Sequence, residues 1–364
     1  MEFICTKCGR KEAVTTRAAH CACGGLWRLA YEPPKFDLAE IDRNEWSLFR
    51  YRRFLALDDE SWRSVSMGEG MTPVVRLDDN VLLKMDYFMP TLSFKDRGAA
   101  TLIAHCKSIG VQQVVQDSSG NAGNAVAAYC ARSGIGCEIF VPEGMSPKKI
   151  DMIRAHGAVC TVVPGTRDHC ADVCREKVER EGVYYANHVY NPFFYEGTKT
   201  YIYEVFEQLG RIPANLVIPV GNGTLFLGAM YALEHLFNSG VIDRFPQIIA
   251  LQSQNCDPLL RAAEHGKTEP EAVMPAPTIA EGIAIGKPMR GREILTLAEK
   301  HGVHFIHAPE EQILSARATL AEEGIYCEHT TAANYAAYLE YCRVYGKTSD
   351  TLITMCGAGL KSDH

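Results

Sequence analysis

The sequence predicts an α/β fold with two parallel sheets. From residue 95 to about residue 185 the chain alternates between helix-patterned stretches and short strands, and the alternation resumes between residues 195 and 355. Such alternation is typical of parallel strands joined by crossover helices. A chain of 364 residues has room for two such domains.

The composition is that of a soluble globular protein. Hydrophobic residues make up 47% and charged residues 22% of the chain, and the net charge of -7 disfavours nucleic acid or an anionic membrane as the main partner. No apolar run is long enough to cross a bilayer, and we expect no secretion signal because no basic segment precedes an apolar core at the start. Most of the 14 cysteines stand singly, which indicates a reducing, cytoplasmic environment.

The elements follow from local patterns. Apolar residues at helical spacing predict helices, and Ser146-Pro147 is a typical cap and first position for one of them. The predicted helices comprise residues 44–57, 95–105, 125–132, 148–156, 195–210, 225–238, 291–301, 311–323 and 332–345, with a further helical stretch between the strands at 160–163 and 183–185. The predicted strands comprise residues 74–77, 81–85, 113–117, 136–141, 160–163, 183–185, 216–220, 248–251, 303–306 and 351–355.

Four cysteines near the start form a separate pattern. Cys5 and Cys8, and thirteen residues later Cys21 and Cys23, lie in a short polar stretch with no core of its own. Two cysteine pairs on tight turns can present four thiolates to zinc, which would then supply most of the order of the segment. We predict a zinc-ribbon-like segment at residues 1–30 with a structural role. The C-x-C spacing of the second pair is unusual, so a degenerate ribbon without metal is the alternative.

Lys95 stands at the head of a predicted helix. A helix start is a positive electrostatic end, where a lysine is poorly placed for helix stability. Either its side chain reaches solvent, or it serves as a neutral nucleophile. Burial or a neighbouring cation lowers the pKa of an amine, and Arg97 lies two residues on. Both interpretations stay open on local sequence alone.

Small residues follow predicted strands at three places, where ligands of open parallel sheets bind. One turn, Ser118-Ser119-Gly120-Asn121, can receive a carboxylate or phosphate at a helix start. A second, Gly221-Asn222-Gly223-Thr224, is typical of a phosphate cradle, and a third is Cys356-Gly357-Ala358-Gly359. A dinucleotide fingerprint is weak here, because Gly228 comes two residues too late. Three such turns together with the lysine predict an anionic cofactor.

Taken as a set, these motifs resemble those of the threonine synthase family, whose enzymes use pyridoxal phosphate. The resemblance covers nearly the whole chain, including the cysteine-rich start. It rests on Gly68-Glu69-Gly70-Met71-Thr72-Pro73, Met89-Pro90-Thr91-Leu92-Ser93-Phe94-Lys95-Asp96-Arg97-Gly98, Ser118-Ser119-Gly120-Asn121, Glu196-Gly197-Thr198-Lys199-Thr200, Thr278-Ile279-Ala280-Glu281-Gly282-Ile283-Ala284 and Cys356-Gly357-Ala358-Gly359-Leu360-Lys361.

The resemblance implies a fold of the tryptophan-synthase-β type, with the cofactor in a cleft between two α/β domains and commonly a homodimer. The large cofactor domain would comprise residues 31–95 and 190–364, and the small domain residues 96–189. Lys95 would hold pyridoxal phosphate as a Schiff base. The other implied roles are Asn121 at the ring hydroxyl, Gly221, Asn222, Gly223 and Thr224 at the phosphate, Ser118, Ser119 and Gly120 at the substrate carboxylate, and Cys356 at the pyridine nitrogen.

The implied chemistry suits these residue types. A substrate amine displaces Lys95, and the freed lysine is positioned to remove the Cα proton. A free cysteine has a pKa of about 8.5, so a thiol at Cys356 would leave the ring nitrogen unprotonated and favour prompt loss of a leaving group. The alternative for Cys356 is a buried packing thiol. The rival lysines Lys84, Lys199 and Lys361 lack the strand-turn-helix setting.

The substrate segment departs from the family pattern. Threonine synthases usually have Asn-Ser and then Asn-Pro-x-Arg before the E-G-x-K-T motif, and this segment helps to bind the phosphate of phosphohomoserine. Here His188 follows Asn187, and Phe194 stands in place of the arginine. An apolar ring cannot hydrogen-bond a phosphate. We expect Asn187 and His188 to contact the substrate, with His188 recognising a side chain or acting as an acid; the alternative is a polar residue at a strand end.

Three functions stay open. The default is a pyridoxal-phosphate-dependent lyase of the threonine synthase type that converts O-phosphohomoserine to threonine and phosphate. The second is a relative with a changed substrate: a serine or threonine dehydratase, an ammonia-lyase, or a β-replacement enzyme such as a cysteate synthase. The third is a non-catalytic protein whose zinc ribbon binds a partner, and the intact Lys95 and glycine turns argue against it.

Overall fold

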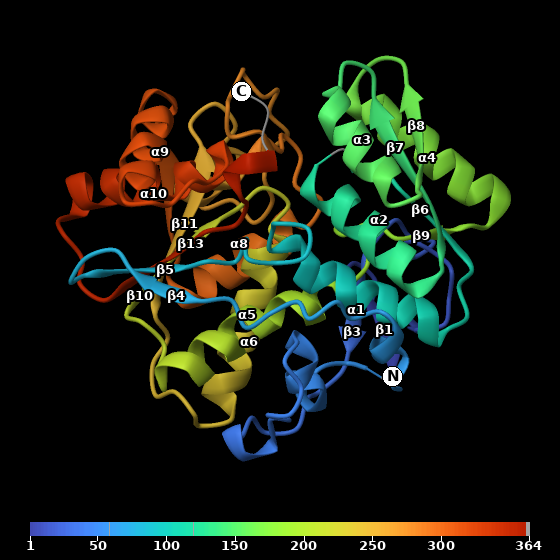
Figure 1. Ribbon diagram of the computed structural model, residues 1–364, viewed down its shortest axis with the longest axis horizontal. Coiled ribbons are helices and arrows are strands. Elements are labelled where there is room, and N and C mark those ends of the chain that lie inside the picture. The colour runs from blue at the N-terminus through green and yellow to red at the C-terminus, as the bar shows by residue number, and fades with distance from the viewer. Residues whose placement is uncertain (58, 119, 362–364) are drawn as a thin grey trace. The chain divides into compact units, whose positions relative to one another are not determined.

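Two compact units make up the protein in a computed structural model (Figure 1). The residues that the structure describes are 1–57, 59–118 and 120–361. Unit 1 is built from residues 1–70 and 95–198, and unit 2 from residues 71–94 and 199–361. Each unit contains its own parallel or mainly parallel sheet.

A four-stranded sheet of order β8-β7-β6-β9 forms the centre of unit 1. Every strand pair in it is parallel, as the alternation predicted. Phe140 belongs to one apolar cluster, whereas its neighbours Ile139 and Val141 belong to another, because successive side chains of a strand point to opposite faces. The strands are β6 Gln113–Gln116, β7 Gly136–Pro142, β8 Val159–Val163 and β9 Tyr184–Tyr185. The helices of this unit are α1 Lys95–Ser108, α2 Asn121–Ser133, α3 Pro147–Ala155 and α4 Arg167–Glu181.

The N-terminal segment forms a small antiparallel sheet of order β2-β1-β3. Its strands are β1 Glu2–Cys5, β2 Lys11–Ala13 and β3 Trp27–Ala30. The rings of Phe3 and Trp27 stack at 6.0 Å, and both belong to an apolar cluster that includes Ala56 and Phe193. The small sheet therefore gains its core from the rest of unit 1.

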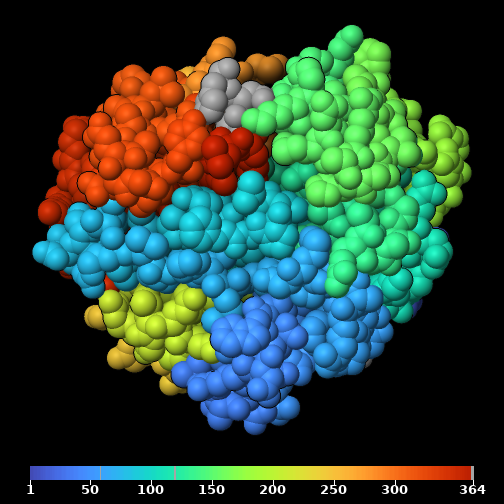
Figure 2. Space-filling model, viewed as in Figure 1, coloured from blue at the N-terminus to red at the C-terminus, as the bar shows by residue number. Residues whose placement is uncertain are grey.

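A six-stranded sheet of order β12-β11-β10-β13-β5-β4 forms the centre of unit 2. All its pairs are parallel except β4 with β5, which form an antiparallel hairpin at the edge. Val75 and Arg76 of β4 are exposed, and the hairpin lies on the face shown in Figure 2. The strands are β4 Val74–Arg76, β5 Val81–Lys84, β10 Asn215–Pro219, β11 Gln247–Ser253, β12 His304–Ala308 and β13 Thr351–Thr354.

The helices of unit 2 follow its parallel strands. Helix α5 begins at Phe193 in unit 1 and continues into unit 2. The full set is α5 Phe193–Leu209, α6 Thr224–Asn238, α7 Pro258–Glu264, α8 Gly291–His301, α9 Ile313–Glu322 and α10 His329–Tyr345. Within the described residues, none of the helices combines the length and the apolar character needed to cross a membrane.

Two helices show how the structure departs from the predicted elements. The helix predicted at residues 44–57 is a shorter 3-10 helix, Leu48–Phe54, which starts where the Ser47 side chain accepts a hydrogen bond from the N–H group of Phe49. Helix α7 was not predicted. Its Asp257-Pro258 start is a helix signal, since proline suits the first helical position, but its seven residues are too few to show a clear period.

The two units group the chain differently from the predicted domains. Residues 31–70 lie in unit 1, with the segment predicted as the small domain. Two hydrogen bonds help to hold them there. The N–H group of Ala56 donates to Glu196 at 2.7 Å, and the Tyr129 hydroxyl and the Glu69 carboxyl group share a hydrogen bond at 3.1 Å.

Candidate active site

Each sheet has one point where the strand order reverses, and the predicted turns lie there. In unit 1, β7 lies on one side of β6 and β9 on the other, so the turns after β6 and β9 flank the reversal. In unit 2, β11 and β13 lie on opposite sides of β10. Ligands of open parallel sheets bind at such points, beyond the carboxyl ends of the strands. The turns concerned are residues 117–121 and 186–190 in unit 1, and residues 220–224 and 355–359 in unit 2.

Hydrogen bonds join the two turns of unit 1. Asp117 accepts from the hydroxyl of Tyr185 at 2.6 Å and from the amide of Asn187 at 2.7 Å. The amide oxygen of Asn187 accepts from the N–H group of Val189 at 2.8 Å. Both polar ends of Asn187 are thus engaged in fixing the turn that carries His188. Its direct contact with a substrate stays a prediction.

The turn after β6 leads directly into α2. Gly120 is the N-cap of this helix, and its lack of a side chain means that no capping oxygen competes for the first N–H groups. A Cβ atom on Gly123 would overlap the carbonyl oxygen of Ser118, so the turn folds closely onto the first turn of the helix. The structure therefore places Ser118, Gly120 and Asn121 at one helix start. Ser119 lies outside the described residues.

Lys95 is half-buried and is the first residue of α1. Its Nζ atom lies 5.9 Å from the ring centroid of Phe194, which is fully buried at the start of α5. A Cβ atom on Gly98 would lie 2.5 Å from Cγ of Phe194 and closer still to two more ring carbons. Gly197 likewise has no room for a side chain against the Arg97 carbonyl. These two helical glycines let α5 and α1 approach, and so place the Phe194 ring beside Lys95.

His188 lies in the same cluster as Lys95 and Phe194. Its ring meets the Phe194 ring edge-on, with centroids 5.7 Å apart. Burial, and then the positive charges of Lys95 and Arg167, hold the pKa of His188 well below its usual range, so the imidazole is neutral. Its Nδ1 atom is buried and has no hydrogen-bond partner among the described residues. A neutral imidazole carries one donor and one acceptor, so an unpartnered nitrogen here suits a polar ligand atom.

The turn after β10 is built for close backbone approach. Gly223 has a φ of 77° and is the N-cap of α6, and a Cβ atom there would lie 3.0 Å from Cγ1 of Ile294. A Cβ atom on Gly221 would lie 3.1 Å from Cα of Ile283, in one of the matching sequence motifs. A positive φ followed by a helix start directs successive N–H groups outward, which is a receptor for phosphate. Asn222 and Thr224 complete this turn.

Cys356 lies two residues after the end of β13 and is buried. Its Sγ atom lies 3.1 Å from the Thr331 hydroxyl and 3.9 Å from the side-chain nitrogen of Asn334. The Oδ1 atom of Asn334 is buried and has no hydrogen-bond partner among the described residues. The carbonyl of Cys356 accepts from the N–H group of Phe94 at 3.0 Å, so this turn is held against the residue that precedes Lys95.

The rival lysines have other partners in unit 2. Lys84 is fully buried and pairs with Glu204 at 2.6 Å, while it also donates to the carbonyl of Thr72. Lys361 is buried and donates to the carbonyl of Thr91 at 3.2 Å. Lys199 is buried within α5. Of the four lysines, Lys95 alone begins a helix.

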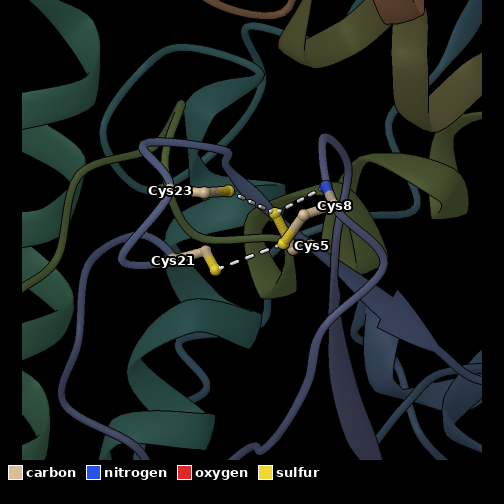
Figure 3. Close-up of side chains that lie close together, drawn as sticks. All are labelled: Cys5, Cys8, Cys21 and Cys23. Atoms are coloured by element: carbon tan, nitrogen blue, oxygen red, sulfur yellow. Dashed lines mark hydrogen bonds between the residues drawn. The ribbon is translucent and has the colours of Figure 1, made fainter.

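The four N-terminal cysteines converge, as predicted from their spacing. Their sulfur atoms all lie within 4.8 Å of one another, with Cys5 3.4 Å from Cys23 and Cys8 3.7 Å from Cys21 (Figure 3). Tetrahedral zinc with Zn–S bonds of about 2.3 Å requires sulfurs ~3.8 Å apart. A Cβ atom on Gly25 would lie 2.5 Å from Cys5 Sγ, so the C-x-C turn depends on this glycine.

Two comparisons with known proteins identify relatives of the chain. The family model described as "Pyridoxal-phosphate dependent enzyme" matches residues 65–357. The threonine synthase of Methanocaldococcus jannaschii is 30% identical over 347 residues, which cover 91% of this chain and 85% of that protein.

Solved structures share the fold. The processed form of threonine deaminase isoform 2 from Solanum lycopersicum has a TM-score of 0.71 at 21% identity, and covers 90% of this chain and 86% of its own. Maize serine racemase has a TM-score of 0.68 at 20% identity, and covers 84% of this chain and 94% of its own. With its family match and its identity to a threonine synthase, the chain belongs to the pyridoxal-phosphate-dependent enzymes and is a lyase similar to threonine synthases.

Proposed function

We propose that this enzyme converts O-phosphohomoserine to threonine and phosphate. The observation that carries the proposal is His188, a buried neutral imidazole with an unpartnered nitrogen, under the positive charges of Lys95 and Arg167. A phosphate ester needs hydrogen-bond donors and positive charge, and this cluster offers both. Arg167, at the start of α4, would supply the cation that Phe194 does not.

The residues present fit the cofactor. Gly221 and Gly223 have no room for side chains, which suits a backbone cradle for the cofactor phosphate at the start of α6. Beside Cys356, the unpartnered oxygen of Asn334 indicates a place for a further polar group. We assign Lys95 to the covalent link, residues 221–224 to the phosphate, Asn121 to the ring hydroxyl and Cys356 to the ring nitrogen.

Lys95 would both hold the cofactor and move a proton. Pyridoxal phosphate, when bound, acidifies the Cα proton of an amino acid. Once a substrate amine has displaced Lys95, its Nζ atom would take that proton. The thiol of Cys356, unlike a carboxylate, would leave the ring nitrogen without a full positive charge, which favours departure of a leaving group.

The substrate would bind through both of its polar ends. Ser118, Ser119 and the N–H groups that follow Gly120 would receive the carboxylate, as anions bind at helix starts. His188 would donate one hydrogen bond to the departing phosphate. A neutral imidazole orients a leaving group without the cost of removing a buried charge from water.

A second function is favoured by Phe194. A fully buried aromatic ring stands where the arginine is expected, and it is wedged against Gly98. An apolar ring at this position suits a small hydroxyl side chain better than a phosphate, so a dehydratase acting on serine or threonine is the alternative.

One experiment separates these functions. The enzyme is incubated with O-phosphohomoserine, and inorganic phosphate and threonine are measured. In Arg167→Gln we expect a KM for this substrate raised about tenfold, as for loss of one hydrogen bond to a charged group. The matched control is Arg180→Gln, which removes the same charge from the last turn of the same helix. No phosphate release, together with keto acid and ammonia from serine or threonine, would instead establish the dehydratase.

The cysteine cluster would hold one structural zinc ion. Cys5, Cys8, Cys21 and Cys23 provide four sulfur atoms within 4.8 Å of one another, close enough for one ion to gather them into a tetrahedral set. The N–H groups of Lys7 and Cys8 point at Cys5 Sγ, at 3.4 and 3.5 Å, and stabilise negative charge on it. A closed set of four ligands leaves no open position for catalysis.

A further inference from the structure

We propose that Glu69 is a positioning residue for Lys95: held as a neutral carboxylic acid, it completes a hydrogen-bond chain through Tyr129 to Asp96, the neighbour of Lys95. The inference rests on the proposed role of Lys95 as the residue that holds the cofactor. It concerns groups that the proposed mechanism does not use.

Three buried side chains from three segments meet at the Tyr129 hydroxyl. Glu69, Asp96 and Tyr129 are all fully buried. The Tyr129 hydroxyl lies 3.1 Å from Glu69, and it also shares a side-chain hydrogen bond with Asp96. Glu69 lies near the end of the first segment of unit 1, residues 1–70, whereas Asp96 is the second residue of α1 and Tyr129 lies in α2. The chain therefore fastens the first turn of α1 to α2.

The protons in this chain can be counted. A phenol has one proton to donate, and an ionised carboxylate can only accept. If both carboxyl groups were ionised, Tyr129 could satisfy only one, and the other would face the phenol oxygen with no proton between them. An unmet contact of this kind is costly in a buried site. A proton on one carboxyl group removes this conflict, because that group then donates to the phenol oxygen while the phenol donates to the other.

The extra proton belongs on Glu69. Asp96 lies in the first turn of α1, where the helix dipole favours a negative charge. Glu69 lies outside a helix, and burial raises its pKa to about 7, although the N–H group of Met67 and the hydroxyl of Ser66 favour its ionised form. The order of donation is thus Glu69 to Tyr129 to Asp96.

This chain fixes the position from which Lys95 acts. Asp96 is covalently next to Lys95, so its anchored side chain sets the rotation of the first turn of α1. When Glu69 loses its proton, the contact with Tyr129 loses its donor and the anchor loosens. Other charged groups on the packed elements include Arg97 on α1, Arg132 on α2, whose Nε atom donates to the carbonyl of Ser66, and Arg50, whose 3-10 helix bonds to the carbonyl of Glu69.

The test uses the full-length enzyme loaded with pyridoxal phosphate, and three variants. Glu69→Gln keeps a neutral side chain with an N–H donor, and Tyr129→Phe removes the bridge but keeps the ring. Tyr203→Phe is the matched control, since it removes another buried hydroxyl, bonded to His235 at 2.7 Å. The measurements are the pH dependence of the cofactor dissociation constant, followed by visible absorbance, and the infrared carbonyl band of a protonated carboxylic acid at pH 6.

We expect the dissociation constant of the wild type to rise as pH passes about 7, and that of Glu69→Gln to stay flat across that pH. Tyr129→Phe should bind the cofactor about tenfold more weakly at every pH, as for loss of one buried hydrogen bond, while Tyr203→Phe behaves as wild type. The infrared band should be present in wild type and absent in Glu69→Gln.

The outcomes that overturn the inference differ from those that overturn the proposed function. Visible absorbance that survives Lys95→Ala would refute the role of Lys95. Absorbance that depends on Lys95 but titrates identically in wild type and Glu69→Gln would refute the role of Glu69 alone. So would the absence of a protonated carboxyl band at pH 6.

Discussion

Replacing Gly98 with alanine would drive a methyl group into the ring of Phe194. A Cβ atom there would lie 2.5 Å from Cγ of the ring and closer to two other carbons. Non-bonded carbons prefer a separation of about 3.5 Å or more, so the ring must retreat by at least about 1 Å. Phe194 is fully buried, and its environment leaves no free direction for that movement.

The magnitude follows from two opposing effects. Overpacking a core costs about 1–3 kcal/mol, whereas alanine is better than glycine in a helix interior by up to about 1 kcal/mol. We therefore expect Gly98→Ala to lower the free energy of unfolding by about 1–2 kcal/mol. Because the displaced ring lies 5.9 Å from Lys95 Nζ, the visible absorbance of the bound cofactor should also change.

Urea unfolding measures the loss in the free energy of unfolding, and a double mutant tests whether the contact with Phe194 causes it. In Gly98→Ala with Phe194→Leu, the smaller side chain leaves room for the methyl group, so the combined loss should be smaller than the sum by about 1 kcal/mol or more. The control is Gly136→Ala, where the nearest atom to the new Cβ lies 3.4 Å away. The close contact would be refuted if Gly98→Ala unfolded at the same urea concentration as the wild type, or if the losses in free energy of unfolding were strictly additive in the double mutant.

Three further outcomes are expected. The purified protein should contain one zinc ion per chain, and Cys8→Ser should remove it and change the fluorescence of the nearby Trp27; a wild-type zinc content in Cys8→Ser would contradict the four-cysteine site. Burial lowers the pKa of His105 to about 3, so its imidazole stays neutral in the native state at pH values where the unfolded chain takes up a proton. The free energy of unfolding should therefore be unaffected by this group above about pH 6.5 and fall by about 1.4 kcal/mol per pH unit between about pH 6.5 and 3. A His105→Gln variant should lack this slope in urea unfolding. Lys84→Met should cost about 3–5 kcal/mol because it leaves Glu204 buried without its cation, and adding Glu204→Gln should recover part of that loss in the same assay.

The turns of the candidate site were predictable because their signals are local. A strand followed by small residues and a helix start identified residues 118, 120–121 and 221–224, and the position of Lys95 at a helix head was visible in the same way. The convergence of the four N-terminal cysteines was also predicted, in spite of their irregular spacing. Family membership makes the chain an enzyme rather than a non-catalytic scaffold.

Long-range pairings were not predictable from the sequence. Nothing local shows that Gly98 receives the ring of Phe194, although a glycine inside a helix is a signal of close approach. Glu69 and Tyr129 are 60 positions apart, so their contact depends on how the helices pack. The short 3-10 helix Leu48–Phe54 was extended in the prediction because its apolar residues matched an α-helical spacing.

The position of Lys95 follows from constraints on the residues immediately before and after it. On one side, Ser93 pairs with Gly357, and the N–H group of Phe94 donates to the carbonyl of Cys356 at 3.0 Å, so the chain is fixed to the end of β13 within one residue of the lysine. On the other side, Lys95 opens α1, where an added residue would rotate every later side chain by about 100°. The bonds of Ser93 and Phe94 therefore fix the position of the Lys95 backbone, and the start of α1 fixes the direction in which its side chain points. The role proposed for Lys95 therefore depends on the backbone around it: the bonds of Ser93 and Phe94 on one side and the first turn of α1 on the other fix the point from which its side chain leaves the chain.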